Sequence, residues 1–214
     1  MPFFNTQFSE SLAPKESEGG GRDGYVNPSS IGKKLPNPFR CAILSEEPLT
    51  GYEIWFDKLD GGKTKRIAAG DTPTPALLQE YEKQIGGTVA CEVDFETKQP
   101  TDKKSIKKCA AFFVYDYDAQ AVKVLSYTQL SLLREIDRKT GDPDYGANLD
   151  SWDLEITKVT SPSNKVSYTA DMKPALRSRD KAVAQKVTDA WQAALASGAD
   201  IWRLTDGGNP FTSK

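Results

Sequence analysis

The chain has 214 residues, of which 38% are hydrophobic, 10% aromatic and 27% charged, a composition typical of a soluble globular protein. No run approaches the roughly 20 apolar residues that a membrane-spanning helix needs. The residues Met1–Asn5 lack the basic and apolar regions of a secretory signal. We therefore expect no membrane association and a cytoplasmic location, in the host cell if the protein is viral.

The charge balance neither requires nor excludes a nucleic-acid ligand. The formal net charge is −2, whereas a protein that binds nucleic acid over much of its surface is usually basic. A binding groove needs only local positive charge, and acidic residues elsewhere can compensate for it.

Several residue types that carry enzyme chemistry are missing. The sequence has no histidine, which removes the commonest general base and excludes Ser-His-Asp and Cys-His arrangements. It also has no phosphate-binding GxxxxGK[ST] motif. Cys41, Cys91 and Cys109 are widely spaced and are interpreted as reduced core residues. We expect no metal site, no cofactor and no enzymatic activity.

The first part of the chain, residues 1–38, predicts a flexible arm. Ser17–Gly24 has the composition of a linker, and several prolines follow it. The aromatic residues near the start either dock on another subunit or belong to a loose terminus; they are Phe3, Phe4 and Phe8.

Folded structure is expected to begin at Phe39, with a meander of strands and one helix. Short apolar or alternating runs bounded by turn residues predict the strands. They are Phe39–Leu44, Tyr52–Phe56, Thr64–Ile67 and Val89–Phe95. The helix is predicted at Pro75–Ile85, where apolar residues have helical spacing and a Gly-Gly pair follows.

Two hairpins separated by a helix come next. Their expected strands are Cys109–Tyr117, Ala121–Leu125, Trp152–Lys158 and Val166–Thr169. The helix runs from Thr128, its expected N-cap, to Lys139, with an apolar stripe that includes Leu130, Leu133 and Ile136.

This order of elements predicts a mainly β fold of the α+β class. In the five-stranded Greek-key barrel of the OB fold, one helix precedes the closing hairpin, and the helix from Thr128 has that place. The OB domain would span residues 39–174, and residues 175–214 would form an appended helix, at Arg179–Ala196, and a tail. Other α+β meanders give a similar pattern, so periodicity alone does not select the OB fold.

The second half of the chain carries a resemblance to a known family. The segments that carry it are, in order, Lys107–Asp116, Val122–Leu125, the helix start Thr128-Gln129, Gly141–Gly146, Asp150–Lys158, Lys165–Ala170 and Pro174. In this order they resemble the C-terminal half of the single-stranded-DNA-binding proteins of tailed phages.

The resemblance implies an OB fold and sequence-tolerant binding of single-stranded DNA during phage DNA replication, recombination or repair. Members of that family carry a Cys/His zinc module, but this chain has no histidine and no clustered cysteines, so a zinc requirement is not transferred. Such proteins commonly end in an acidic tail that recruits replication partners. Here Thr205–Lys214 is short and nearly neutral, which argues against recruitment through the tail.

Binding of an unpaired strand requires aromatic faces for the bases and cations for the phosphates. Tyr52–Arg66 interleaves both kinds of side chain, and Lys98–Lys108 is the most basic stretch of the chain. In an OB barrel, the early strands and the loop between the first two strands border the ligand. The candidate DNA-binding residues are Tyr52, Trp55, Lys58, Lys63, Lys65, Arg66, Lys103, Lys104, Lys107, Tyr115 and Tyr117.

Strand alternation divides the aromatic candidates between core and surface. An isoleucine between Tyr52 and Phe56 places both of them toward the core, so Trp55 is the better stacking candidate unless the next segment covers it. On the later strand, Tyr115 and Tyr117 share one face, and some of that strand's aromatic residues must be core.

Two other classes of function stay open. A non-catalytic scaffold module would bind a replication or transcription protein, or a second copy of the chain, through the arm and the helix of residues 179–197. A metal-dependent nuclease would use a set of carboxylates that suit Mg²⁺ but also occur in common turn sequences. They are Asp116, Asp118, Asp142 and Asp144.

Overall fold

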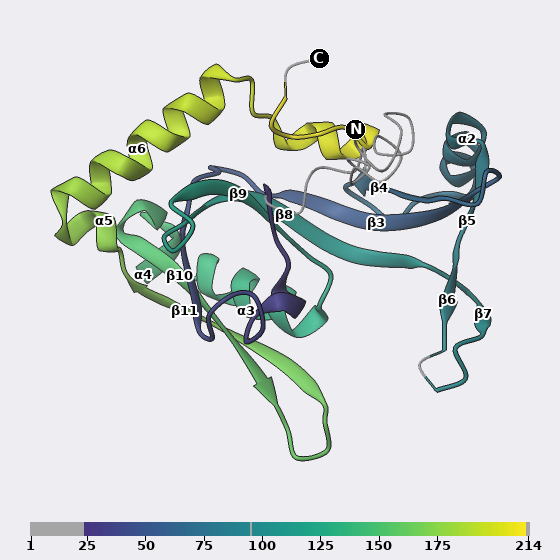
Figure 1. Ribbon diagram of the computed structural model, residues 1–214, viewed down its shortest axis with the longest axis horizontal. Coiled ribbons are helices and arrows are strands. Elements are labelled where there is room, and N and C mark those ends of the chain that lie inside the picture. The colour runs from purple at the N-terminus through teal and green to yellow at the C-terminus, as the bar shows by residue number, and fades with distance from the viewer. Residues whose placement is uncertain (1–23, 95, 213–214) are drawn as a thin grey trace, which may run out of the picture.

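A computed structural model describes residues 24–94 and 96–212 (Figure 1). In chain order the elements are β1 (Tyr25–Val26), η2 (Pro28–Ser30), β2 (Phe39–Ile43), β3 (Leu49–Lys58), β4 (Lys63–Ala69), α2 (Pro75–Ile85), β5 (Gly87–Val89), β6 (Cys91–Val93), β7 (Pro100–Lys104), β8 (Ile106–Asp116), β9 (Ala121–Tyr127), α3 (Leu130–Thr140), α4 (Pro143–Gly146), η3 (Leu149–Ser151), β10 (Trp152–Thr160), β11 (Val166–Pro174), α5 (Leu176–Arg179), α6 (Lys181–Ala196) and η4 (Ile201–Asp206). Within the described ranges, none of the helices has the length and hydropathy that a membrane span would need.

The fold is mainly β, of the α+β class, and is built on one large mixed sheet. Among the described residues this sheet has nine strands, six of them in the order β1-β9-β8-β2-β10-β11. β2 pairs with β8 on one side and with β10 on the other, and β3 pairs with β8, β4 and β5. β6 and β7 form a separate two-stranded ribbon that projects from one end of the sheet (Figure 1). We call this ribbon, residues 91–104, the hairpin arm.

The largest core lies on the inner side of the curved sheet, where α3 covers it. Leu132 and Ile136 of α3 are buried in one cluster with Phe112 of β8, Leu154 of β10 and Met172 of β11. The alternating burial of β11 therefore follows from packing of one face against this helix, whereas residues 109–116 of β8 are buried on both faces.

The outer side of the same sheet is covered by the C-terminal segment. The Phe113 ring lies 5.3 Å from the Trp191 ring of α6 and 5.5 Å from the Phe211 ring. Tyr115 is buried in a cluster with Val187 of α6, and η4 packs nearby on the same side. The apolar face of α6 is thus used within the chain, so a partner that binds this helix would contact its other faces.

Most elements predicted from the sequence are confirmed. The β3–β4, β8–β9 and β10–β11 hairpins are present, and α2 has the predicted bounds. Gly86 ends α2 in the left-handed conformation, with φ of 68°, which glycine adopts without strain. The C-terminal helix begins slightly later than predicted, with Asp180 as its N-cap.

The boundary of folded structure at Phe39 is wrong. Tyr25–Val26 forms a short parallel strand beside β9, and Val26 and Ile31 are buried in the main core at 1% and 0% exposure. The neighbouring prolines made this segment resemble a flexible linker, so the sequence did not predict that these apolar residues belong to the core. Residues 1–23 of the predicted arm, which include Phe3, Phe4 and Phe8, lie outside the described residues.

Two details of the predicted domain also differ. Gln129, not Thr128, is the N-cap of α3, and Leu130 is exposed while Leu132 is buried, which shifts the apolar stripe by part of a turn. The predicted five-stranded closed barrel is also not present among the described residues. On the side away from β8, β9 pairs with Tyr25–Val26 rather than with the closing hairpin β10–β11. The two ends of the sheet therefore do not meet, and the sheet stays open.

Candidate nucleic-acid interface

Trp55 lies at the point where β3 changes its neighbour. Up to Ile54, β3 pairs with β8, and from Phe56 it pairs with β5. At the junction, the Trp55 amide donates to the Ser105 carbonyl (3.2 Å), and the Trp55 carbonyl accepts from the Ala90 amide (2.8 Å). The hairpin arm leaves the sheet from this gap, so the backbone of Trp55 anchors both of its ends.

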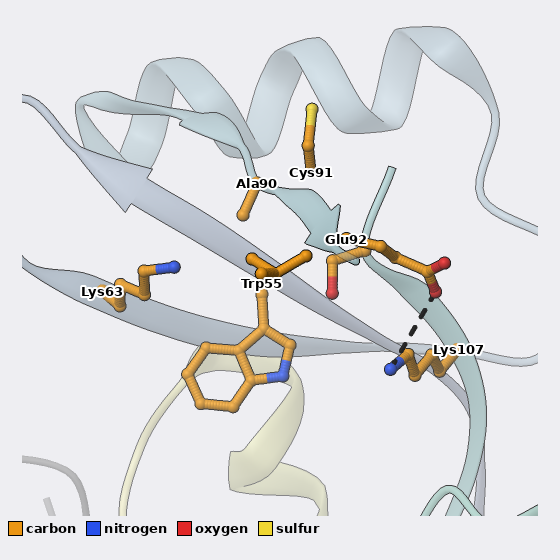
Figure 2. A pocket seen from close by; sticks show the side chains of 8 residues that line it. Trp55, Lys63, Ala90, Cys91, Glu92 and Lys107 are labelled. Carbon is orange, nitrogen blue, oxygen red and sulfur yellow. Dashed lines mark ion pairs between the residues drawn. The ribbon is translucent and has the colours of Figure 1, made fainter. Parts of the chain in front are cut away.

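A pocket of about 340 Å³ lies between the sheet and the base of the arm. Its lining includes Trp55 from β3, Lys63 from β4, Glu92 and Val93 from β6, and Lys107 from β8. Figure 2 shows the indole with Lys63 on one side and Lys107 on the other. Because this volume is at the lower end of the range for small-ligand pockets, it suits a group of the size of a nucleotide.

Three lysines of the candidate set share the Trp55 face of the sheet. Lys65 is the cross-strand partner of Trp55, and its Nζ lies 5.8 Å from the centre of the indole ring. Lys63 and Lys107 occupy the same face at alternating positions of β4 and β8. The structure therefore brings one aromatic ring of β3 together with two cations of β4 and with a third, Lys107, that is distant in the sequence.

Acidic side chains partner each of these lysines. Lys65 Nζ is 2.8 Å from Glu53 Oε2, Lys63 Nζ is 3.4 Å from Asp57 Oδ1, and Lys107 Nζ is 3.9 Å from Glu92 Oε1. The site is consequently an array of ion pairs rather than a field of unpaired positive charge.

Three candidates lie on the opposite face, toward α2. The Tyr52 hydroxyl hydrogen-bonds the Thr72 hydroxyl at 2.8 Å. Arg66 donates to Gln84 Oε1 at 2.6 Å and lies over the Tyr81 ring at 5.2 Å. Lys58 is exposed at the end of β3 and has the parity of this face. Arg66 and Lys65 therefore cannot extend one continuous cationic track, although they are adjacent in sequence.

Tyr115 and Tyr117 do not support the role expected of them. Tyr115 is 3% exposed beneath α6, and its ring packs edge-on against Tyr117 at 5.5 Å. The Tyr117 hydroxyl donates to Asp153 Oδ1 at 2.7 Å; burial first, and then this bond, raises the Tyr117 pKa. Neither ring is free to stack on a base, because the C-terminal helix α6 packs against both of them. That helix comes from a distant part of the chain, so the sequence pattern around the two tyrosines did not indicate their burial.

The lysines of β7 lie on the arm. Lys103 pairs with Glu92 at 3.1 Å and is 75% exposed, and it is not among the residues that line the pocket. Lys104 donates to the Val89 carbonyl at 3.4 Å, which fastens the arm to β5.

Sequence reasoning missed the acids and the arm. Glu53 is almost buried and accepts a 2.8 Å hydrogen bond from the Trp55 indole Nε1, while Glu92 joins two lysines. Alternation placed Glu53 beside Trp55, but a glutamate in a strand is ordinarily a solvated residue. The strand predicted at Val89–Phe95 is divided between β5 and β6. Its partner in the arm, Pro100–Lys104, has little apolar alternation and gave no strand signal, and the pairing of the two contains a register shift.

Two of the cysteines, and the carboxylates considered for a nuclease site that are described next, have structural roles. Cys41 and Cys109 are buried; burial first and then the Glu53 carboxylate raise the pKa of the Cys109 thiol to about 12. Asp116 accepts from two backbone amides and from Lys123, and Asp142 caps α4. In the described part of the chain, no group of three or more Cys, Asp or Glu side chains is placed to hold a metal ion.

Comparison of the chain with family models, with curated proteins and with solved structures gives no match.

Proposed function

We propose that this protein binds single-stranded DNA without base selectivity, with Trp55 as the stacking surface and Lys63, Lys65 and Lys107 as phosphate contacts. The observation that carries the proposal is an indole bordered by lysines in an open pocket of nucleotide size. Stacking on an aromatic ring contributes about 1–3 kcal/mol per base and is tolerant of sequence, because every base has a π face. The phage resemblance of the second half of the chain supports a role in phage DNA replication, recombination or repair in the host cytoplasm.

We also propose that the sheet is an open variant of the OB arrangement. β2 with β3 would be its first strand, β8 and β9 the second and third, α3 its helix, and β10–β11 its closing hairpin. Two features support this: β2 pairs with both β8 and β10, and α3 separates the two hairpins in the chain. OB folds are often partly open and bind oligonucleotides on their second and third strands and on the loop after the first.

In that arrangement, residues 59–105 are the loop after the first strand, and the pocket lies where this loop rejoins the sheet. The outer face of β8 and β9 is covered by α6 and η4 over much of its length. The Trp55 end of the sheet is therefore where a strand of DNA would make contact.

Titration of labelled single- and double-stranded oligonucleotides, followed by fluorescence anisotropy at several salt concentrations, tests the proposal. We expect tighter binding of the single strand, with log K falling by about 0.7 per phosphate contact for each unit of log salt concentration. The double variant Lys63→Ala, Lys107→Ala should weaken that dependence. The control Lys33→Ala, Lys34→Ala removes the same charge from exposed residues outside the pocket and should not. Absence of salt-dependent binding by the wild-type protein would overturn the proposal.

A further inference from the structure

The Glu92 carboxylate lies between the hairpin arm and the sheet, beside lysines of both. Its Oε2 lies 3.1 Å from Lys103 Nζ on β7, and its Oε1 lies 3.9 Å from Lys107 Nζ on β8. The dashed line in Figure 2 marks the second pair, at the edge of the pocket beside the indole. One acid thus bridges two cations that belong to different sheets.

We propose that Glu92 is an internal competitor of the ligand: a nucleotide phosphate that enters the pocket displaces its carboxylate from Lys107. This inference rests on the proposed function and adds a regulatory element to the same site. A carboxylate and a phosphate accept hydrogen bonds from an ammonium group in the same way, so they compete for one lysine.

The geometry suits an exchange of this kind. The Glu92–Lys107 distance of 3.9 Å is long for an ion pair, and the Lys107 side chain is 50% exposed, so water already reaches it. Exposed pairs of this kind contribute little to stability, and the lysine can turn toward a stronger partner at small cost. Lys103 remains beside Glu92 as a second partner, so the displaced carboxylate keeps a counter-ion.

A further consequence concerns the arm itself. An isolated two-stranded hairpin is marginally stable in water. The arm is joined to the sheet by backbone bonds at Ala90 and Ser105, and the Glu92–Lys107 pair adds a side-chain link between the two. Displacement of Glu92 releases this link and lets the arm adjust to the bound strand.

The test compares Glu92→Gln with Glu96→Gln, in the full chain, by anisotropy titration with oligo(dT) over a series of salt concentrations. Gln keeps the size of the side chain at Glu92 and removes its charge. Glu96, exposed near the tip of the arm, changes the net charge equally. We expect Glu92→Gln to bind about two- to five-fold more tightly at low salt, the range that corresponds to an exposed ion pair. Its salt slope should become more negative by up to about 0.7.

A second comparison keeps the result independent of folding effects. In the Lys107→Gln background, Glu92→Gln should give a clearly smaller gain, because the competed cation is gone. Equal affinities of Glu92→Gln and Glu96→Gln, weaker binding by Glu92→Gln, or an undiminished gain without Lys107 would each overturn the inference. If these occur while the wild-type protein binds and depends on Trp55, only this inference fails; if the wild-type protein does not bind, the proposed function fails with it.

Discussion

Glu53 fixes the side chain of Trp55 two residues further along the same strand. The indole Nε1 donates a 2.8 Å hydrogen bond to Glu53 Oε1, while Lys65 Nζ lies 2.8 Å from the other carboxylate oxygen. Because Glu53 is nearly buried, both contacts are held in a fixed geometry rather than in solvent. The stacking surface of the site is therefore oriented before any ligand arrives, which reduces the entropy that binding would cost.

Replacing Glu53 by Ala should lower the free energy of unfolding by about 1–3 kcal/mol, because the indole N–H and the Lys65 ammonium lose their acceptor. Glu53→Gln keeps an acceptor for the indole and loses the ion pair, so its effect should be smaller. Urea denaturation followed by circular dichroism measures both. Equal stability of the wild-type protein and the Ala variant would show that the contacts do not order the strand.

The three cysteines should differ in reactivity. Cys41 and Cys109 are buried and their thiol pKa values are raised, chiefly by burial, so the reactive thiolate is scarce at neutral pH. Cys91, on the arm, is partly exposed. We expect a thiol reagent at pH 7.5 to modify one cysteine per folded chain and all three in denaturant, as counted by mass spectrometry. Rapid modification of Cys41 or Cys109 would contradict the packing of the sheet.

A pH-dependent contribution to stability comes from Asp171. Hydrogen bonds from Lys139 first, and then from Lys173, lower its pKa to about 2. The folded-state pKa lies below the unfolded value of about 3.9, so the contribution is present above pH 4 and disappears as the pH falls toward 2.

Because Asp171 is 48% exposed, screening by solvent keeps its contribution small. Asp171→Asn should lower stability at pH 7 by less than about 1 kcal/mol. The wild-type protein and the variant should converge near pH 2 in denaturant melts. A constant difference for Asp171→Asn at all pH values would argue against the role of its charge.

Local sequence patterns predicted the parts of the fold that depend on neighbouring residues. The helix Pro75–Ile85 and the outward position of Trp55 follow from glycine placement and strand parity. Burial of Tyr115 depends instead on Val187 of a helix formed much later in the chain. No local pattern contains that information.

The acids of the site were missed for a related reason. Glu53 and Glu92 are polar residues in strands, and their meaning depends on which lysines the sheet brings opposite them. Local patterns also could not predict that the sheet stays open, since this depends on the pairing of Tyr25–Val26 with β9. Long-range pairing thus decides both the charge balance of the pocket and the closure of the sheet.

The role of Trp55 is tested most directly by the affinities of Trp55→Ala and Trp55→Phe for oligo(dT) and oligo(dA), measured by anisotropy at one low salt concentration. If bases stack on this ring, Trp55→Ala should lose about 1–3 kcal/mol with both oligonucleotides, and Trp55→Phe, which keeps an aromatic face, should lose much less. Binding by a folded Trp55→Ala protein that equals the wild-type affinity would contradict the account.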